Sequence, residues 1–466
     1  MLFNSHVFVL VFLPAVLAGW WWLQGHRARL IFLTLASYAF YGWWNWKFIP
    51  LMIISTSADF VAGRAIYRAA SPSAKKGWLM GLLAFNLGLL GVFKYFDFLA
   101  ATWNAGASWV GAPTLPLLHV ILPIGISFYT FNSISYTIDV YRGRLEPSGS
   151  FVEFAAFVAM FPHLIAGPIV RYADMGEQFR QLRRRMSSDE IATGIWLFVI
   201  GMAKKVLVAD IIAFHFVTPL FSGAAGMSFL TSWVAVVAYT LQIYFDFSAY
   251  SDMAVGLALF LGLRFPQNFN SPYKAVNPSD FWRRWHISLS SWLRDYLFIP
   301  LGGSHGTKAQ TMRNLVITMF LGGLWHGASW TFVIWGLYHG ALLAGHAVLS
   351  ARGLVPKSRT VSMALTFVAV MIGWVFFRAE SLPAALAILR GLVGAGGVES
   401  LSAARTLLGT PWMVWLVGGL IAVFTLPNTW ELRYPRTVAA GVLVAVLFLI
   451  CVLRFSAPSP FIYYQF

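Results

Sequence analysis

The segment VSMALTFVAVMIGWVFF, residues 361–377, carries no charged side chain and stands between Arg359 and Arg378. Its length approaches the roughly 20 apolar residues that a helix needs to cross the hydrocarbon core of a bilayer. Further apolar runs occur at residues 7–22, 79–93 and 233–263. The sequence therefore predicts an all-α polytopic membrane protein, a bundle of about eleven transmembrane helices.

The composition supports a membrane protein. Of the 466 residues, 59% are hydrophobic and only 11% are charged, too few charges to cover a soluble protein of this size. The net charge of +16 comes from basic residues in short loops beside apolar runs, a pattern typical of loops that face anionic lipid headgroups. We therefore expect contact with membrane lipid and no nucleic-acid partner. The single cysteine, Cys451, excludes an internal disulfide or thiolate zinc site.

The distribution of basic loops predicts an orientation. Arg27 and Arg29 follow the first apolar run, whereas a cleaved signal peptide has its basic residues before that run. We expect a retained first helix with a periplasmic N-terminus in a multi-pass protein of the bacterial inner membrane. Two loops without charge, residues 104–116 and 219–228, suit the periplasmic side.

Two apolar segments do not fit simple spans. Residues 151–170 contain Pro162 and Pro168, and basic residues at both ends place both ends in the cytoplasm. Residues 314–348 are too long for one ordinary span and are interrupted by glycines. We expect both to be broken or re-entrant elements, which survive at membrane depth only when buried in protein or lining a polar cavity. The basic residues after the first segment are Arg171, Arg180, Arg183, Arg184 and Arg185. The glycines that interrupt the second segment are Gly322, Gly323 and Gly327.

Two histidine motifs are candidates for chemistry. His286 and Ser290 would share a helix face among alternating aromatic and basic residues, and His326 stands among glycines in an apolar run. A desolvated imidazole favours its neutral form, which accepts a proton from a hydroxyl group. The alternative for each histidine is a hydrogen bond between helices without a catalytic role. We expect such a structural role for three others, His163, His339 and His346.

Ionisable residues inside apolar runs are also candidates, because they are costly in a membrane. Asp246 and Asp252 suit either ion coupling in a transporter or ion pairs with basic residues of the segment 264–313. Lys204 or Lys205 is expected to pair with Asp210 near a helix end. No H-E-x-x-H motif and no histidine pair four residues apart is present, so we expect no metal site.

At these motifs the chain resembles the membrane-bound O-acyltransferase family, nearly from end to end. The most specific matches are Trp282-Arg283-Arg284-Trp285-His286 and Gly323-Leu324-Trp325-His326-Gly327. Other matching segments are Met1–Ser5, Leu122–Phe128, Phe161–Pro168, Tyr244–Ser248 and Tyr463–Phe466.

The resemblance implies that His326 is the catalytic residue in a membrane tunnel and that His286 assists from nearer the cytoplasm. It implies no permanently bound cofactor; the donor substrate is acetyl-CoA or the phosphopantetheine thioester of an acyl carrier protein. The acceptor hydroxyl approaches from the other side. Alginate-type members are thought to pass acetyl groups to periplasmic partner proteins that modify the polymer.

The basic, aromatic segment 264–313 offers cations for the phosphates of coenzyme A or for an acidic carrier protein. We expect one integral-membrane domain, residues 1–466, with this segment on its cytoplasmic side. The function expected is O-acetylation of an exopolysaccharide, with alginate as the first choice. A transporter or flippase without acyl transfer, or a structural subunit, remains the alternative. Candidate donor-binding residues are Arg283, Arg284, Trp285, Ser290, Arg294, Trp325 and Asp246.

Overall fold

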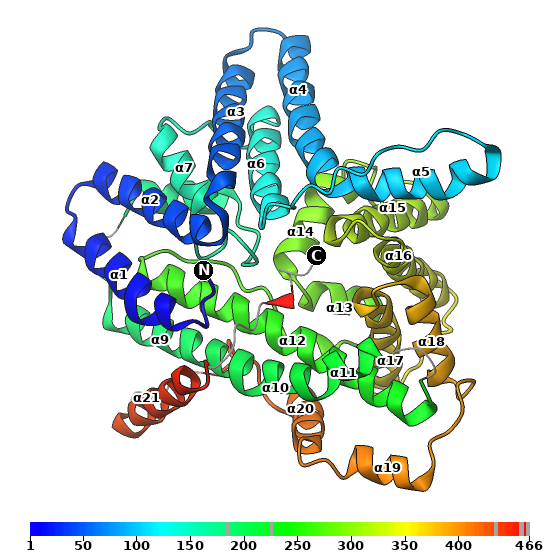
Figure 1. Ribbon diagram of the computed structural model, residues 1–466. Helices are drawn as coiled ribbons and strands as arrows, with labels where there is room; N and C mark the ends of the chain where they lie inside the picture. Colours follow the sequence, from blue (N-terminus) through cyan, green and yellow to red (C-terminus); the bar gives the residue numbers. More distant parts are fainter. Residues whose placement is uncertain (183–185, 224–226, 433–436, 456–460, 463–466) are drawn as a thin grey trace. The chain divides into compact units, whose positions relative to one another are not determined.

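The computed structural model describes residues 1–182, 186–223, 227–432, 437–455 and 461–462. Within these residues the chain is helical and has no β-strand, so the predicted all-α class is confirmed (Figure 1). The basic triplet Arg183–Arg185 and the aromatic C-terminus Tyr463–Phe466 lie outside the described residues. The chain divides into two compact units, Met1–Ile195 with Ala254–Pro266 and Trp196–Met253 with Gln267–Phe466.

Each unit is built from helices, and α9 (Ser188–Ala203) and α12 (Phe229–Phe260) contain the boundaries between the units. The helices of the first unit are α1 (Leu13–Trp22), α2 (His26–Asn45), α3 (Ile49–Arg68), α4 (Pro72–Leu90), α5 (Phe96–Val110), α6 (Ile126–Tyr141), α7 (Phe151–Ala159) and α8 (Tyr172–Arg180). Those of the second are α10 (Asp210–Ile212), α11 (Thr218–Ser222), α13 (Pro278–Arg284), α14 (Ile287–Leu293), α15 (Lys308–His326), α16 (Trp330–Ala351), α17 (Arg359–Arg378), α18 (Leu382–Leu392), α19 (Leu401–Leu408), α20 (Met413–Thr425) and α21 (Val438–Leu453).

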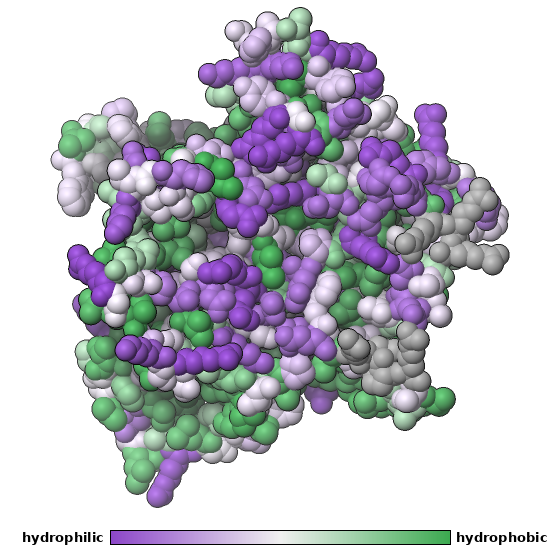
Figure 2. Space-filling view, turned by 180° about the vertical axis from the view of Figure 1, so that it is seen from behind, coloured by the Kyte–Doolittle hydropathy of each residue, from purple (hydrophilic) through white to green (hydrophobic). Residues whose placement is uncertain are grey.

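Several of these helices are long and apolar enough to cross a bilayer. In the described residues there are four such continuous segments, or five if the bent pair α19–α20 is counted as one span. The prediction of about eleven spans also counted shorter and broken apolar segments, so that number stays a prediction. The four segments are His26–Arg68, Pro72–Val110, Trp330–Ala351 and Arg359–Arg378. On the face seen in Figure 2, hydrophilic side chains gather over the middle and apolar ones lie toward the lower left edge.

Polar residues fix where helices α13 and α15 begin. The side chain of Asn277 accepts a hydrogen bond from the backbone N–H of Asp280 at the start of α13, and Pro278 follows it. Thr307 and Gln310 form a reciprocal capping box at the start of α15. Each such cap contributes about 0.5–2 kcal/mol to helix stability, so the local sequence sets these starting points.

The first predicted broken element is present in the first unit. Helix α7 ends at Ala159, and residues 160–170 continue as buried, non-helical chain. His163 in this segment is fully buried; its Nε2 lies 2.9 Å from the carbonyl oxygen of Phe157 and its Nδ1 lies 3.3 Å from the amide nitrogen of Asn132. Both ring nitrogens thus have polar partners, as expected for a structural histidine.

The second predicted broken element is a helical hairpin. Helices α15 and α16 pack closely along each other, and the turn between them is at Gly327–Ser329. The interruption expected at Gly327 is therefore confirmed, and the one expected at Gly322-Gly323 is wrong. Gly323 instead lies within α15 and permits close approach: a Cβ there would stand 2.4 Å from the carbonyl oxygen of Phe332. The hairpin places His326, the last residue of α15, at its turn.

Gly336 of α16 supports the same close approach, which gives a testable prediction. A Cβ at this position would lie 2.5 Å from the carbonyl oxygen of Met319, a backbone atom that cannot move without shifting α15. We expect Gly336→Ala to destabilise the protein by about 1–3 kcal/mol, measured by thermal unfolding in detergent. Gly345→Ala in the same helix is the matched control, because nothing lies within 4 Å of its added Cβ. Equal melting temperatures for the two variants would contradict this packing.

Candidate active site

His326 is held in a cage of aromatic rings within the second unit. Its side chain is 5% exposed, and its ring centroid lies 5.0 Å from that of Trp335 in α16 and 5.0 Å from that of Phe377 in α17, both nearly edge-on. The following Gly327 leaves room for Phe332, whose ring a Cβ at Gly327 would approach to 2.1 Å. The glycines of the motif therefore let three helices close around the imidazole.

His286 occupies a break between helices, which corrects the expectation that it shares one helix face with Ser290. Helix α13 ends at Arg284, α14 begins at Ile287, and His286 between them has φ +44° and ψ +56°. A non-glycine residue in this left-handed region costs about 1–3 kcal/mol, and such strain is common at functional sites. The Ser290 hydroxyl donates to the carbonyl of Trp285, back toward the break.

Asn268, which the sequence analysis did not single out, orients His286. Its side-chain oxygen lies 3.2 Å from His286 Nδ1 and accepts a hydrogen bond of 2.9 Å from the Ser288 hydroxyl. Its amide nitrogen donates to the Ser251 hydroxyl at 3.1 Å. The His286 ring is fully buried, with Phe247 edge-on at 4.7 Å. Only its polar type and its place in the segment 264–313 could have marked Asn268 as a candidate.

Trp325 brings the two histidine motifs together. Its ring centroid lies 4.9 Å from that of His326 and 6.2 Å from that of His286. Residues about forty positions apart in the chain thus share one buried aromatic neighbour. The sequence prediction that both motifs contribute to one functional interior is consistent with this arrangement.

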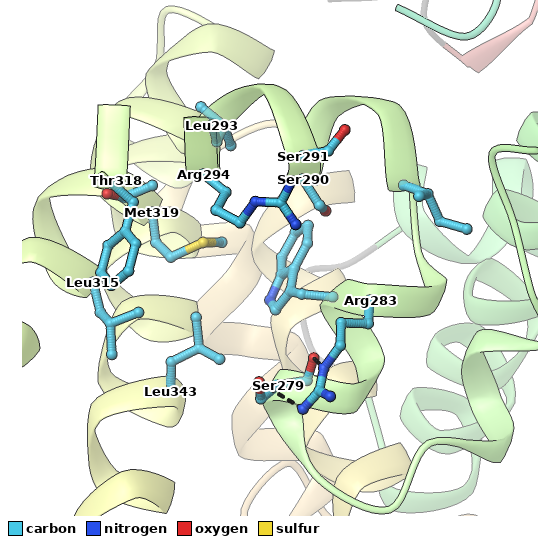
Figure 3. Close-up of a pocket in the computed structure, with 13 residues that line it drawn as sticks. Ser279, Arg283, Ser290, Ser291, Leu293, Arg294, Leu315, Thr318, Met319 and Leu343 are labelled. Atoms are coloured by element: carbon cyan, nitrogen blue, oxygen red, sulfur yellow. Dashed lines mark hydrogen bonds between the residues drawn. The ribbon is translucent and has the colours of Figure 1, made fainter. Parts of the chain in front are cut away.

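A cavity of about 310 Å³ opens beside these residues, between α13, α14 and the hairpin. Arg294 of the π-helical turn η7 (Arg294–Phe298) extends into it, and Arg283 stands on its rim, hydrogen-bonded to Ser279 (Figure 3). The opposite wall comes from α15 and α16 and is apolar except for Thr318, as Figure 3 shows. The lining residues are Ser279, Trp282, Arg283, Ile287, Ser290, Ser291, Leu293, Arg294, Phe298, Leu315, Thr318, Met319 and Leu343.

The predicted donor-binding residues separate into two groups. Arg283, Ser290 and Arg294 line this cavity together. Arg284 instead forms an ion pair of 2.9 Å with Asp280 and donates to the carbonyl of Asn270. The other three do not line it: Trp285 packs against Trp374 at 4.8 Å, Trp325 lies between the histidines, and Asp246 is buried elsewhere in the unit.

Two tryptophans separate the cavity from His326. Trp282 lines the cavity, and its ring centroid lies 5.7 Å from that of Trp335, which in turn packs against His326. His339 fills the space behind both indoles, at 5.2 Å from Trp282 and 4.8 Å from Trp335. The side chains of Trp282 and Trp335 therefore lie between the cavity and His326. A change of rotamer at these two residues would alter this barrier.

The buried carboxylates find partners other than those expected. Asp246 and Asp252 do not pair with the basic segment 264–313; Asp246 lies 2.7 Å from Lys205, and Asp252 lies 2.7 Å from Lys204. Lys205 also contacts Asp210 at 2.8 Å, the structural pair that the sequence suggested. Both lysines belong to the π-helical turn η4 (Lys204–Ala209). These pairs balance charge inside the unit. At the cavity, Arg294 forms an ion pair of 2.6 Å with the neighbouring Asp295, and Arg283 is hydrogen-bonded to Ser279.

Comparison with known proteins agrees with the motifs. Residues 148–378 match the model of the MBOAT, membrane-bound O-acyltransferase family, a range that includes both histidines and the cavity. The chain is 41% identical to a protein of Azotobacter vinelandii named "Probable alginate O-acetylase AlgI", with all of both chains covered. It is 46% identical to a protein of the same name from Pseudomonas aeruginosa, over 83% of this chain and 73% of that protein.

A relative with a different polymer in its name is similar at the same level. The Helicobacter pylori protein named "Peptidoglycan O-acetyltransferase" is 40% identical, over 86% of this chain and 81% of that protein. Relatives whose names give different polymers are thus similar to most of this chain. Together with the apolar helices, these likenesses show that the chain belongs to the membrane-bound O-acyltransferase family and is a multi-pass membrane acyltransferase.

Proposed function

We propose that this protein takes an acetyl group from a cytoplasmic thioester and passes it across the inner membrane for O-acetylation of an exopolysaccharide. The donor is acetyl-CoA or the phosphopantetheine arm of an acyl carrier protein. Alginate is the polymer proposed first, because the relatives named alginate O-acetylase are similar over the full chain. The acceptors at the membrane are periplasmic transfer proteins of the polysaccharide machinery.

The observation that carries the proposal is the position of His326 next to a cation-rimmed cavity. The imidazole is buried among aromatic rings and packs against Trp335, which in turn packs against Trp282 in the cavity wall. A volume of about 310 Å³ suits the pantetheine arm of a donor and is too small for a polysaccharide. Arg283 and Arg294 at the rim suit the phosphates at the other end of such an arm.

The chemistry assigned to His326 is general base catalysis. The imidazole takes the proton of the acceptor hydroxyl as that oxygen attacks the thioester carbonyl. The carbon–sulfur bond breaks, the ester bond forms, and the proton returns to the departing thiolate. His286 is proposed to assist from the donor side, held by Asn268. A water-poor aromatic surrounding protects the thioester from hydrolysis during this step.

The proposed orientation rests on the distribution of basic residues among the loops. The basic segment 264–313 faces the cytoplasm, where coenzyme A and carrier proteins are found, and the N-terminus lies in the periplasm. The rival reading, a transporter or flippase, relied on Asp246 and Asp252 as ion-coupling groups. Each of these carboxylates already has a lysine partner, which removes the observation that favoured the rival.

Consumption of the donor tests the proposal. Purified protein in detergent is incubated with acetyl-CoA, or with acetylated carrier protein, together with its periplasmic partner and an acceptor polysaccharide. We expect release of free thiol and appearance of labelled acetyl ester on the acceptor. Intact donor after prolonged incubation with both thioester types would support the transporter or structural-subunit alternatives.

Loss of the rim cations is expected to weaken donor binding. Charge-assisted hydrogen bonds are worth about 1.5–3 kcal/mol, so Arg283→Gln and Arg294→Gln should each raise the KM for donor about tenfold with a smaller change in kcat. The effect should shrink at high salt, because both guanidinium groups are largely exposed. Arg352→Gln is the control, since Arg352 is exposed at the end of α16 and does not line the cavity. An unchanged KM in both rim variants would remove these residues from donor binding.

A further inference from the structure

A groove of about 460 Å³ lies between α3 and α4 in the first unit and shares no residue with the cavity beside the histidines. Figure 1 shows the two helices side by side, joined at the top by the short connection 69–71. Both helices belong to the long apolar segments that can cross a bilayer. The residues that line the groove are Ala58, Val61, Ala62, Ala74, Gly77, Trp78, Gly81, Leu82 and Phe85.

Two glycines of α4 keep this groove open. A Cβ added to Gly77 or to Gly81 would meet no heavy atom within 4 Å. Gly63 of α3 differs, because a Cβ there would lie 2.7 Å from the ring of Tyr136 in α6. Gly63 therefore serves helix packing inside the unit. Gly77 and Gly81 instead border a space that no side chain of the described residues fills.

The length of the groove corresponds to one leaflet of a bilayer. Ala74 and Phe85 are the first and last lining residues of α4, and the helix rises about 16 Å between them at 1.5 Å per residue. The hydrocarbon core is about 30 Å thick, so each leaflet contributes about 15 Å. This length suits the acyl chain of a lipid. A transmembrane helix of a partner crosses both leaflets, so the groove would hold only about half of it.

The end of the groove nearest the α3–α4 connection is basic. Lys75 precedes Trp78 by three positions, and Arg68 follows Val61 by seven, so each cation lies on the same helix face as a lining residue. Residues 60–96 include no acidic residue. No ion pair in the described part of the chain includes Arg68 or Lys75. Two cations without a carboxylate favour an anionic group at this end.

Aromatic side chains place the same end at the membrane surface. Trp78 is 49% exposed and Tyr67 of α3 is 55% exposed. Tryptophan and tyrosine are enriched at the level of the lipid headgroups, where their rings contact both hydrocarbon and water. In the orientation proposed above, the connection 69–71 faces the cytoplasm, and the cytoplasmic leaflet is rich in anionic lipids. The apolar part of the groove therefore begins at the depth at which acyl chains begin.

We propose that this groove binds one anionic phospholipid, with an acyl chain along Gly77 and Gly81 and the phosphate between Arg68 and Lys75. The acyl chain covers apolar surface that the protein leaves open, and the phosphate balances the two cations. The bound lipid joins α3 to α4 and stabilises the first unit. This site is independent of acyl transfer, so either proposal can fail without the other.

Thermal unfolding of the purified full-length protein in mixed micelles tests the site. At constant total lipid, dioleoyl phosphatidylcholine is replaced stepwise by dioleoyl phosphatidylglycerol, which has the same acyl chains and one negative charge. A ligand that binds only the folded state raises the melting temperature in a saturable way, here by about 2–4 °C. Native mass spectrometry of the same samples should show one phosphatidylglycerol retained by each protein chain.

A leucine at position 81 blocks the groove and should abolish the rise in melting temperature. Gly88→Leu is the matched control for Gly81→Leu. Both glycines lie in α4, neither has a heavy atom within 4 Å of an added Cβ, and Gly88 does not line the groove. Both substitutions also gain the same helix propensity, so any difference between them reports on the groove.

The headgroup contacts are tested by a second variant, which also serves if Gly81→Leu does not fold. Arg68→Gln combined with Lys75→Gln should remove the preference for phosphatidylglycerol over phosphatidylcholine. The proposal is overturned if the two lipids give equal melting temperatures with the unchanged protein, or if Gly81→Leu responds as Gly88→Leu does. Loss of a second copy or of a co-purifying membrane protein in Gly81→Leu, with the lipid response intact, would assign the groove to a helix instead.

Discussion

Replacing His326 by alanine is expected to lower acyl transfer by about 10²–10⁴-fold, because a positioned general base supplies roughly that factor. The ring lies at the turn of the α15–α16 hairpin, against Trp335 and Phe377, and Trp335 in turn packs against Trp282 in the cavity wall. The rate is measured as labelled acetyl ester formed from a thioester donor in membranes that contain equal amounts of protein.

The control for this variant is a histidine from the same helical hairpin. His346→Ala removes a partly exposed imidazole from α16 that does not contribute to the cavity lining. We expect its transfer rate to stay within about twofold of the unchanged protein, since surface substitutions away from special contacts have small effects. A His326→Ala protein that inserts normally and keeps its full rate would end the assignment of His326 as the base.

The second large effect is expected at Lys205. Its ammonium group is buried, with a side-chain exposure of 2%, and lies 2.7 Å from Asp246 and 2.8 Å from Asp210. Lys205→Met leaves the buried Asp246 without a counter-charge, and breaking such a pair costs about 3–5 kcal/mol. Net stabilities are only about 5–15 kcal/mol, so we expect a large loss of folded protein on size-exclusion chromatography in detergent.

A compensating variant separates charge balance from other causes. Lys205→Met combined with Asp246→Asn removes both charges. In the unchanged protein the backbone N–H of Ile462 donates to Asp246 at 2.8 Å, and the asparagine keeps an oxygen that can accept this hydrogen bond. The double variant should therefore recover part of the folded yield. Lys308→Met is the control, because Lys308 is exposed at the start of α15. A Lys205→Met protein as stable as this control would show that the ion pairs are not needed.

The fold class and the two broken elements followed from sequence because they depend on local composition. Apolar runs longer than a bilayer needs, proline at 162 and 168, and basic residues at both ends are all visible in the chain. The second break was expected at Gly322-Gly323 and at Gly327, and glycine alone does not decide between these positions. Gly323 serves the packing of α15 on α16, whereas the chain turns at Gly327, and sequence does not distinguish these two uses of glycine.

The break at His286 was missed for a tertiary reason. Residues 284–287 include neither glycine nor proline, so nothing local interrupts a helix there. In the structure the backbone N–H of Asn270 donates to the carbonyl of Arg284, and that of Ile287 donates to the carbonyl of Asn268. These bonds to a distant segment replace the helical ones, and they place the Asn268 side chain against His286.

The candidate donor-binding residues were predicted as a group. Which of them face the cavity depends on where helix α13 begins, because that sets the face of the helix on which each residue lies. Arg283 and Ser279 share one face of α13, which borders the cavity, and Arg284 shares the next face with Asp280. Residues four apart in a helix are neighbours, so an acidic residue at 280 captures Arg284 and not Arg283. The partners of Asp246 and Asp252 could not be chosen from sequence, because Lys204 and Lys205 lie more than forty residues away.

The most direct test of the account is transfer across a sealed membrane. Proteoliposomes with the protein in one orientation hold an acceptor polysaccharide and its partner protein inside, and a membrane-impermeant labelled acetyl donor is added outside. The account predicts labelled acetyl ester on the enclosed acceptor when the segment 264–313 faces the donor, and none with His326→Ala. Label that appears only on acceptor placed on the donor side, or that still reaches the enclosed acceptor with His326→Ala, would contradict it.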